Sequence, residues 1–125
     1  MSKHCVSIAA LSLLFGLTLQ AEVKLPSIFG SHMVLQRDHA NPVWGWAEPG
    51  EKVTVSIAGQ SQMVTTGKDG AWRVKLQPLK VNAKGQTLTI KGSNTIKFTD
   101  VLVGEVWICS GQSNMAWSVD RAYDP

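Results

Sequence analysis

Apolar and polar side chains alternate along several short stretches between residues 23 and 98. Over residues 52–58, Val53, Val55 and Ile57 occupy every second position, with lysine, threonine and serine between them. The same period of two recurs over residues 72–76, 87–91 and 96–98. A period of two puts all the apolar side chains of a strand on one face. The pattern therefore predicts half-buried β-strands.

Turn-forming residues separate these stretches, and no helical period competes with them. Glycine, proline and asparagine favour turns because they adopt backbone angles that strands do not. The breaks are Glu48-Pro49-Gly50, Ala58-Gly59-Gln60, Gly67-Lys68-Asp69-Gly70 and Gly92-Ser93-Asn94. Short strands at such regular spacing predict a β-sandwich domain over residues 22–100.

The pattern changes after Asp100. Residues 101–109 form a nearly continuous apolar run, which is typical of a strand buried on both faces in a parallel sheet. Residues 110–113 then predict a turn, and residues 114–123 have the composition of a helix's first turns. We therefore expect a mainly β chain, in which the sandwich leads into the first strand-turn-helix of a truncated α/β domain, residues 101–125.

The first 21 residues have the pattern of a secretory signal peptide. Lys3 precedes an uncharged, mostly apolar run over residues 6–19, and the small residue Ala21 follows. This run is too short to span a bilayer comfortably, and no cysteine stands directly after it to carry a lipid anchor. We expect export to the periplasm or the medium, without a membrane anchor, and a mature chain of 125 − 21 = 104 residues.

Charge and cysteine content exclude several function classes. Without Lys3 there are 12 − 1 = 11 basic residues against 9 acidic ones, a net charge of +2. They are scattered rather than clustered, so we expect neither a nucleic-acid nor a membrane-binding face. Cys5 leaves with the signal, and Cys109 alone cannot form an intramolecular disulfide. Nor do cysteines and histidines cluster as metal ligands do, so no metal is expected.

Ser113 is the candidate catalytic residue. It follows Gly111 and Gln112 where the predicted strand gives way to the predicted helix. Unpaired amide hydrogens at the start of a helix can stabilise an oxyanion, and glycine allows a sharp turn. A serine in this place is suited to nucleophilic attack if a base takes its proton. An N-cap role for Ser113 is the structural alternative.

Three strings resemble the sialate O-acetylesterase-like family, within the SGNH (GDSL-like) hydrolase group. They are residues 25–37, residues 42–51 and, around the serine, residues 104–115, Gly-Glu-Val-Trp-Ile-Cys-Ser-Gly-Gln-Ser-Asn-Met. The resemblance covers essentially the whole mature chain. It implies a β-sandwich leading into an SGNH hydrolase domain. It also implies hydrolysis of acetyl esters on sialic acids or related sugars, through an acyl-serine intermediate and without a cofactor.

The family's functional residues carry over only in part. Ser113 matches the nucleophile, and its amide would contribute to the oxyanion hole. Gln112 and Asn114 match motif neighbours that shape the turn and contact the substrate. In the family, the Asp-x-x-His base and the remaining oxyanion donors lie downstream of the nucleophile, and no such pattern follows Ser113 here. Asp38 and His39 are adjacent and precede the serine, and they are expected to be exposed polar residues of a loop. The chain is thus interpreted as an N-terminal fragment, nearly inactive alone.

A non-catalytic role is the competing hypothesis. Trp44, Trp46 and Trp72 could form a platform for sugar rings, although tryptophans at alternating strand positions are more often core, and core is favoured here. The sandwich would otherwise be purely structural.

Four residues near the predicted turn receive structural interpretations. Trp107 and Trp117 are expected to pack between sheet and helix. Glu105 is either functional or a buried carboxylate paired with a cation or a backbone N–H, and Cys109 is expected to be a small buried hydrophobe. The sugar, the acyl group and the oligomeric state stay open.

Overall fold

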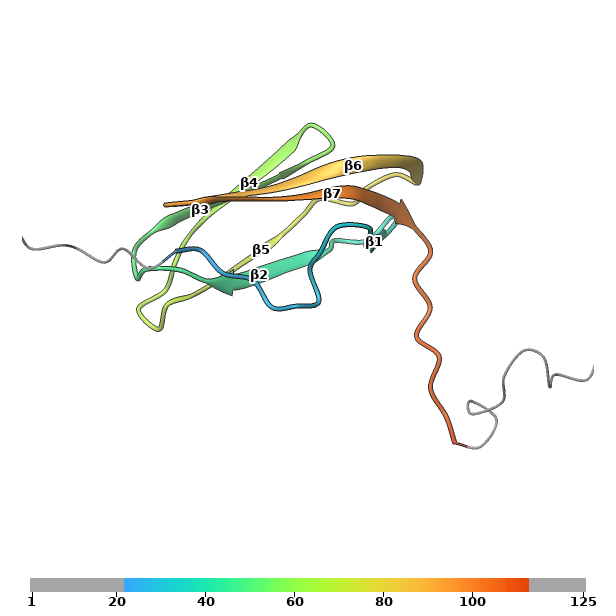
Figure 1. Cartoon of the computed structure of the whole chain (residues 1–125), viewed down its shortest axis with the longest axis horizontal. Coiled ribbons are helices and arrows are strands. Elements are labelled where there is room, and N and C mark those ends of the chain that lie inside the picture. The colour runs from blue at the N-terminus through green and yellow to red at the C-terminus, as the bar shows by residue number, and fades with distance from the viewer. Residues whose placement is uncertain (1–21, 113–125) are drawn as a thin grey trace, which may run out of the picture.

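The computed structural model describes residues 22–112 of the 125-residue chain. Within this range the chain is mainly β and contains no helix (Figure 1). The strands are β1 (Val34–Gln36), β2 (Pro42–Trp46), β3 (Lys52–Ile57), β4 (Gln60–Thr65), β5 (Ala71–Lys75), β6 (Asn82–Lys91) and β7 (Thr95–Gly104). The mainly β character expected from the period of two is confirmed.

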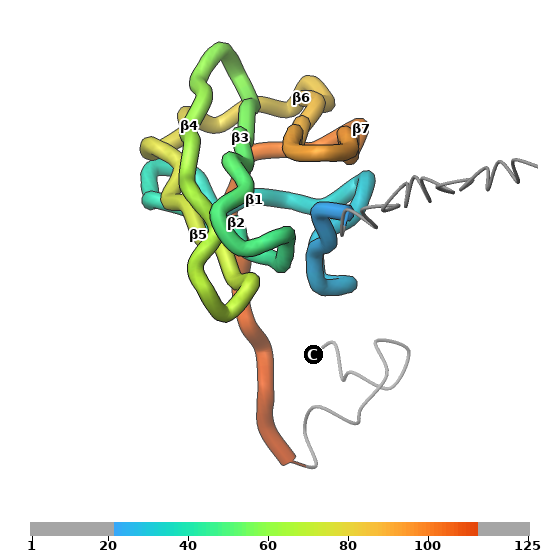
Figure 2. Tube along the Cα trace, turned by 90° about the vertical axis from the view of Figure 1, so that its left-hand side faces the viewer, coloured from blue at the N-terminus to red at the C-terminus, as the bar shows by residue number. Residues whose placement is uncertain are grey.

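The strands form two sheets. One has five strands in the order β1-β7-β6-β3-β4, and the other consists of β2 and β5. All pairings are antiparallel except that of β1 with β7, which is parallel. Figures 1 and 2 show the two-stranded sheet lying against the larger one.

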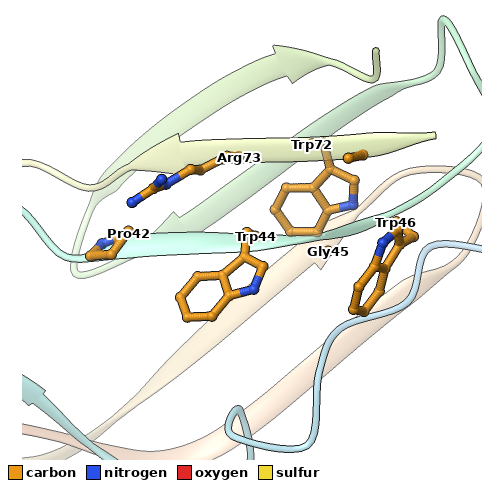
Figure 3. Close-up of a pocket in the computed structure, with 7 residues that line it drawn as sticks. Pro42, Trp44, Gly45, Trp46, Trp72 and Arg73 are labelled. Carbon is orange, nitrogen blue, oxygen red and sulfur yellow. The ribbon is translucent and has the colours of Figure 1, made fainter. Parts of the chain in front are cut away.

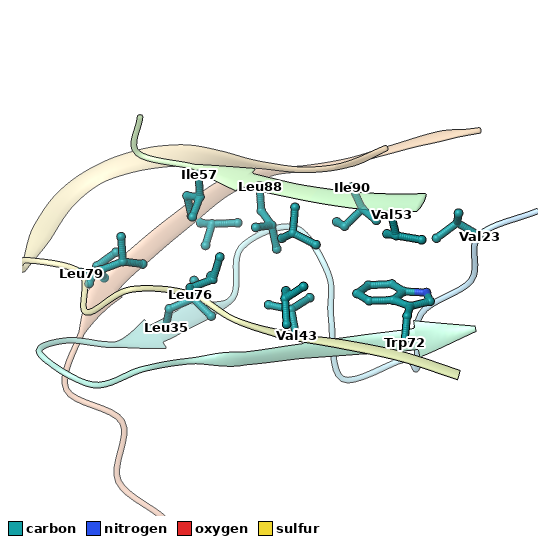
Figure 4. Close-up of a cluster of buried hydrophobic side chains, with 14 of the residues drawn as sticks. Val23, Leu35, Val43, Val53, Ile57, Trp72, Leu76, Leu79, Leu88 and Ile90 are labelled. Atoms are coloured by element: carbon teal, nitrogen blue, oxygen red, sulfur yellow. The ribbon is translucent and has the colours of Figure 1, made fainter. Parts of the chain in front are cut away.

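A single hydrophobic core lies between the two sheets (Figure 4). The larger sheet contributes the inward side chains predicted from the alternation, Val53, Val55 and Ile57, together with Leu88 and Ile90. The smaller sheet and the loop after it contribute Val43, Trp72, Val74 and Leu76. Because each strand supplies every second residue, the apolar faces of both sheets are removed from water together.

The predicted turns are present between these strands. The clearest is the β3–β4 hairpin, in which Ile57 pairs with Gln60 and only Ala58 and Gly59 form the loop. Both loop residues have positive φ, 50° and 76°. Positive φ at both positions is typical of the type I′ turn, which favours two-residue hairpins because it matches the twist of the flanking strands, and glycine adopts this φ without steric cost.

The strand predicted over residues 101–109 is wrong in its second half. β7 ends at Gly104, and residues 105–112 lie outside any strand and are exposed. Val101 and Val103 are buried in the core described above, between β6 and β1. Beyond Gly104 no strand of the described range pairs with the chain, so the apolar run continues without a neighbour to bury it. The predicted helix over residues 114–123 lies outside the described residues.

The side-chain predictions for this run are corrected as well. Trp107 is 82% exposed, Cys109 is an exposed free thiol, and Glu105 is exposed rather than buried. Each was expected to be covered by a surrounding sheet or helix, and no element between residues 22 and 112 covers them. Trp117 lies outside the described residues. The domain boundaries at residues 21 and 100 stay predictions.

In the part of the chain that the structure describes, no helix is long and apolar enough to cross a membrane.

Candidate functional site

The predicted nucleophile turn lies at the edge of the described structure. Gln112 is described and is exposed, at the end of the segment that leaves the domain after β7 (Figure 1). Ser113 and Asn114 lie outside the described residues. The three predicted site residues therefore stay a prediction from the sequence, and the structure gives the geometry of the segment that leads to them.

The start of this segment is held by the side chain of Gln36, the last residue of β1. Its Nε2 donates to Oε2 of Glu105 at 3.0 Å, and its Oε1 accepts the amide hydrogen of Val106 at 2.7 Å. One amide side chain thus satisfies a backbone donor and a carboxylate at the point where β7 stops. Hydrogen bonds of this kind fix the direction in which the segment leaves the sheet.

Arg37, which follows Gln36, also binds the chain at the end of β7. Its amide hydrogen donates to the carbonyl of Gly104 at 2.9 Å, and its Nε lies 3.2 Å from Oε1 of Glu105. We call Gln36, Arg37 and Glu105 the exit clamp. The ion pair is half-exposed, so the geometry of the clamp matters more than its Coulomb energy.

Asp38 extends the clamp into a row of charges on the surface. Its carboxylate lies 3.1 Å from Nε of Arg37 and accepts a hydrogen bond from Nζ of Lys80 at 2.8 Å. The hydrogen bond from Lys80 lowers the pKa of Asp38 below its ordinary value, and the charges of Lys80 and Arg37 act in the same direction, against a desolvation effect that raises it. Asp38 and His39 are exposed, as expected for loop polars.

The exit clamp was not found from the sequence as a functional feature. Gln36 and Glu105 are 69 residues apart along the chain, and the parallel pairing of β1 with β7 brings them together. Gln36 and Arg37 are the last two residues of the string 25–37, which resembles the family. That resemblance assigns no role to either residue.

A second feature is a hollow on the outer face of the two-stranded sheet (Figure 3). Its volume is ≈ 470 Å³, within the range of sites for small molecules. We call it the aromatic hollow, and it is lined by Pro42, Trp44, Gly45, Trp46, Ala71, Trp72 and Arg73.

The prediction of core tryptophans is right for one residue and wrong for two. Trp72 is 3% exposed and belongs to the core, whereas Trp44 is only partly buried and Trp46 is 50% exposed. The inward positions of β2 are taken by Val43 and Gly45, which places both tryptophans of that strand on the other face.

Gly45 occupies an inward position of β2 at which only a glycine fits. A Cβ at this position would collide with the carbonyl oxygen of Lys24 and would lie 2.9 Å from the Trp72 ring. The inward position therefore has no room for a side chain, least of all an indole. Lys24 and Trp46 exchange two backbone hydrogen bonds here, of 2.8 and 2.9 Å.

No set of three or more histidine, cysteine, aspartate or glutamate side chains between residues 22 and 112 is arranged to hold a metal ion. Another acid–base contact of the described residues joins His32 Nδ1 and Asp100 Oδ2, at 2.7 Å on an exposed surface.

Comparison with known proteins gives these features a context. No family model matches the chain. It is 36% identical to the sialate O-acetylesterase of Mus musculus and 38% identical to that of Homo sapiens, in each case over 112 residues. These alignments cover 81% of this chain and 21% of each relative. In a crystal structure of a carbohydrate acetylesterase from Xanthomonas citri, a 36% identical region superposes with a TM-score of 0.72, over 77% of this chain and 22% of that one.

The described domain is thus shared with carbohydrate esterases. More particularly, the chain is a homologue of the sialate O-acetylesterases, and the family resemblance of its sequence is confirmed. It spans about a fifth of the length of the curated relatives that it matches.

Proposed function

We propose that this chain is the β-domain and nucleophile segment of a carbohydrate O-acetylesterase, acting on acetyl esters of sialic acids or related sugars. The observation that carries the proposal is the identity of 36–38% to sialate O-acetylesterases across 81% of the chain. The structural similarity to a carbohydrate acetylesterase supports the same substrate class.

The proposed reaction has two steps at Ser113. The hydroxyl oxygen attacks the acetyl carbonyl carbon while a base takes its proton, and the ester bond to the sugar breaks as the sugar oxygen is protonated. Water then attacks the acetyl-serine, which releases acetate and restores the hydroxyl. Amide hydrogens, including that of Ser113, would stabilise the negative charge on the acetyl oxygen. No cofactor is required.

Gln112 and Asn114 flank the nucleophile in this proposal. Their side-chain amides offer both hydrogen-bond donors and acceptors, which suits them to orient a sugar hydroxyl or the ester beside Ser113. The exit clamp would contribute indirectly, because it sets where the segment carrying these residues leaves the β-domain.

Residues 114–125 contain no histidine that could act as the base. A serine without its base loses most of its reactivity, since removing one member of such a triad costs orders of magnitude in rate. We therefore expect residues 1–125 alone to hydrolyse acetyl esters very slowly.

Two structural and cellular assignments belong to the same proposal. We assign the two sheets with their shared core to a β-sandwich, and residues 1–21 to a signal peptide that directs export to the periplasm or the medium. N-terminal sequencing of the protein recovered outside the cytoplasm would test the second assignment, and an N-terminus near Glu22 is expected.

Acetate release tests the enzymatic proposal. The protein read from Met1 to its stop codon should release acetate from O-acetylated sialic acid, and Ser113→Ala should lower the rate by at least about a thousandfold. Ser61→Ala, which removes a hydroxyl from β4, is the matched control and should leave the rate unchanged. Equal rates for the Ser113→Ala variant and the unchanged protein would remove Ser113 from the mechanism.

A further inference from the structure

The outer face of the β2–β5 sheet is rich in aromatic and basic side chains. Trp44 pairs with Arg73 across the two strands, Trp46 pairs with Ala71, and Pro42 pairs with Lys75. Directly paired residues point to the same side of a sheet, and the inward positions hold Val43, Gly45, Trp72 and Val74. The outward set thus contains two indoles and two cations, and no carboxylate.

The spacing of these side chains creates the aromatic hollow. Two residues along a strand are separated by roughly 6.6 Å, so Trp44 and Trp46 stand about one sugar ring apart on the same face. Figure 3 shows them side by side along β2, with Arg73 on the neighbouring β5. Ala71, opposite Trp46, is short and leaves the space open.

The hollow is held in place before any ligand binds. The Trp44 ring meets that of Phe29 edge to face, with centroids 4.9 Å apart. The backbone of Trp46 is fixed by its two hydrogen bonds with Lys24. A site whose aromatic groups are already positioned loses less entropy on binding than a flexible one.

We infer that the aromatic hollow is a second, non-catalytic binding site for a carboxylated sugar. The apolar face of the sugar ring would lie against Trp44 and Trp46, and the guanidinium of Arg73 would hold the carboxylate in a charge-assisted contact. The sugar class rests on the proposed function, whereas the preference for a carboxylate rests on the charges of the face itself.

Nearby charges favour an anion over a neutral ligand. Lys75 lies two residues beyond Arg73 on the same face of β5 and adds a second positive charge. The turn before β5 contains Asp69, whose Oδ1 accepts the amide hydrogen of Ala71 at 3.1 Å. Asp69 is not among the residues that line the hollow, whereas Arg73 is.

A titration followed by NMR tests the inference. The probes are the methyl glycoside of N-acetylneuraminic acid and the same glycoside with its carboxylate converted to the amide. The acid should shift the indole N–H signals of Trp44 and Trp46 with saturation, and leave that of Trp107, which lies outside the hollow, in place. Conversion to the amide should weaken binding by about tenfold, because a hydrogen bond to a charged group is lost.

Three variants separate the contributions of the indole rings and of the Arg73 charge to sugar binding. Trp46→Ala should weaken binding of the acid by about tenfold through loss of ring stacking. Arg73→Gln should remove most of the preference for the acid over the amide, while Arg37→Gln, which removes a guanidinium elsewhere, should preserve the tenfold preference. Circular dichroism of each variant would establish that it is folded.

Several results would overturn the inference. They are no saturable shift with the acid, equal affinities of the unchanged protein for acid and amide, and unchanged binding after Trp46→Ala. Sedimentation showing that Trp46→Ala dissociates a dimer without altering sugar binding would instead assign the face to self-association. Ser113→Ala should abolish acetate release and leave the titration intact, so the failure of the enzymatic proposal is distinguishable from failure of this one.

Discussion

The β-domain and the segment that leaves it use similar residues in opposite ways. Ile90 in β6 is fully buried, whereas Ile108, with the same side chain, is 94% exposed. The difference lies in strand pairing: β6 has neighbours on both sides, while residues 105–112 have none within the described structure. Apolar character therefore stabilises this fold only where a facing sheet completes the burial.

Shortening the two isoleucines should give the largest contrast. Ile90→Ala removes a core side chain and leaves a cavity, which should lower the free energy of unfolding by about 2–5 kcal/mol. Ile108→Ala should change it by less than about 0.5 kcal/mol, because the side chain is already in water. Urea unfolding of both variants would measure the difference. Equal losses of stability would mean that the segment after β7 is packed against the domain.

Substitution of Gly45, which lies between Trp44 and Trp46, should lower the free energy of unfolding nearly as much as a substitution in the core. Gly45→Ala would push a methyl group into the Lys24 carbonyl and the Trp72 ring, at a cost of about 1–3 kcal/mol. Gly30→Ala is the control, because nothing lies within 4 Å of the added methyl. Thermal unfolding would compare them, and an unaffected Gly45→Ala variant would contradict the packing that turns Trp44 and Trp46 outward.

The exit clamp should contribute less to stability than to local order. Gln36→Ala removes two hydrogen bonds and should cost about 0.5–1.5 kcal/mol. Hydrogen exchange at the Val106 amide should become much faster, since that amide loses its acceptor. Gln62→Ala, on β4, should leave this exchange rate unchanged. Continued protection of the Val106 amide in the Gln36→Ala variant would show that the clamp does not hold the segment.

The charge row beside the clamp should have the smallest effect, visible only in acid. Since the folded-state pKa of Asp38 is lowered, its contribution is present above the unfolded-state pKa and is lost as pH falls through the folded-state value. Lys80→Gln should raise the pKa of Asp38 towards its ordinary value and reduce the loss of stability on acidification. An NMR titration of the Asp38 carboxyl would detect this. Lys68→Gln is the control, and an unchanged Asp38 pKa in Lys80→Gln would contradict the assigned cause.

Much of the fold could be predicted from the sequence because its signal is local. The period of two in residues 52–58 and 72–76 identified the inward side chains of β3 and β5, and the turn residues marked where strands end. The sequence prediction placed Trp44 and Trp46 on the inward face of β2, which is wrong. The close approach of the Lys24 backbone to the inward Gly45 comes from another segment of the chain, so the local pattern does not reveal it.

The surroundings of the predicted site were harder to predict, because they depend on contacts between residues that are far apart in the sequence. An apolar run such as residues 101–109 indicates that burial is possible, but not which element provides it, and the pairing partners end at Gly104. The contacts of Gln36 and Arg37 with Glu105 depend on β1 lying beside β7, far away in sequence. Ser113, Gln112 and Asn114 were proposed from motif resemblance, which indicates chemistry without geometry.

The most direct test of the account is to trap the acetyl group. The complete protein, mixed rapidly with an O-acetylated sialic acid and quenched in acid, should yield a peptide containing Ser113 that is heavier by one acetyl group. Tandem mass spectrometry should place the modification on Ser113, and Ser113→Ala should abolish it. An acetyl group on any other residue, or turnover without a modified peptide under conditions that trap such intermediates, would contradict the proposed role of Ser113.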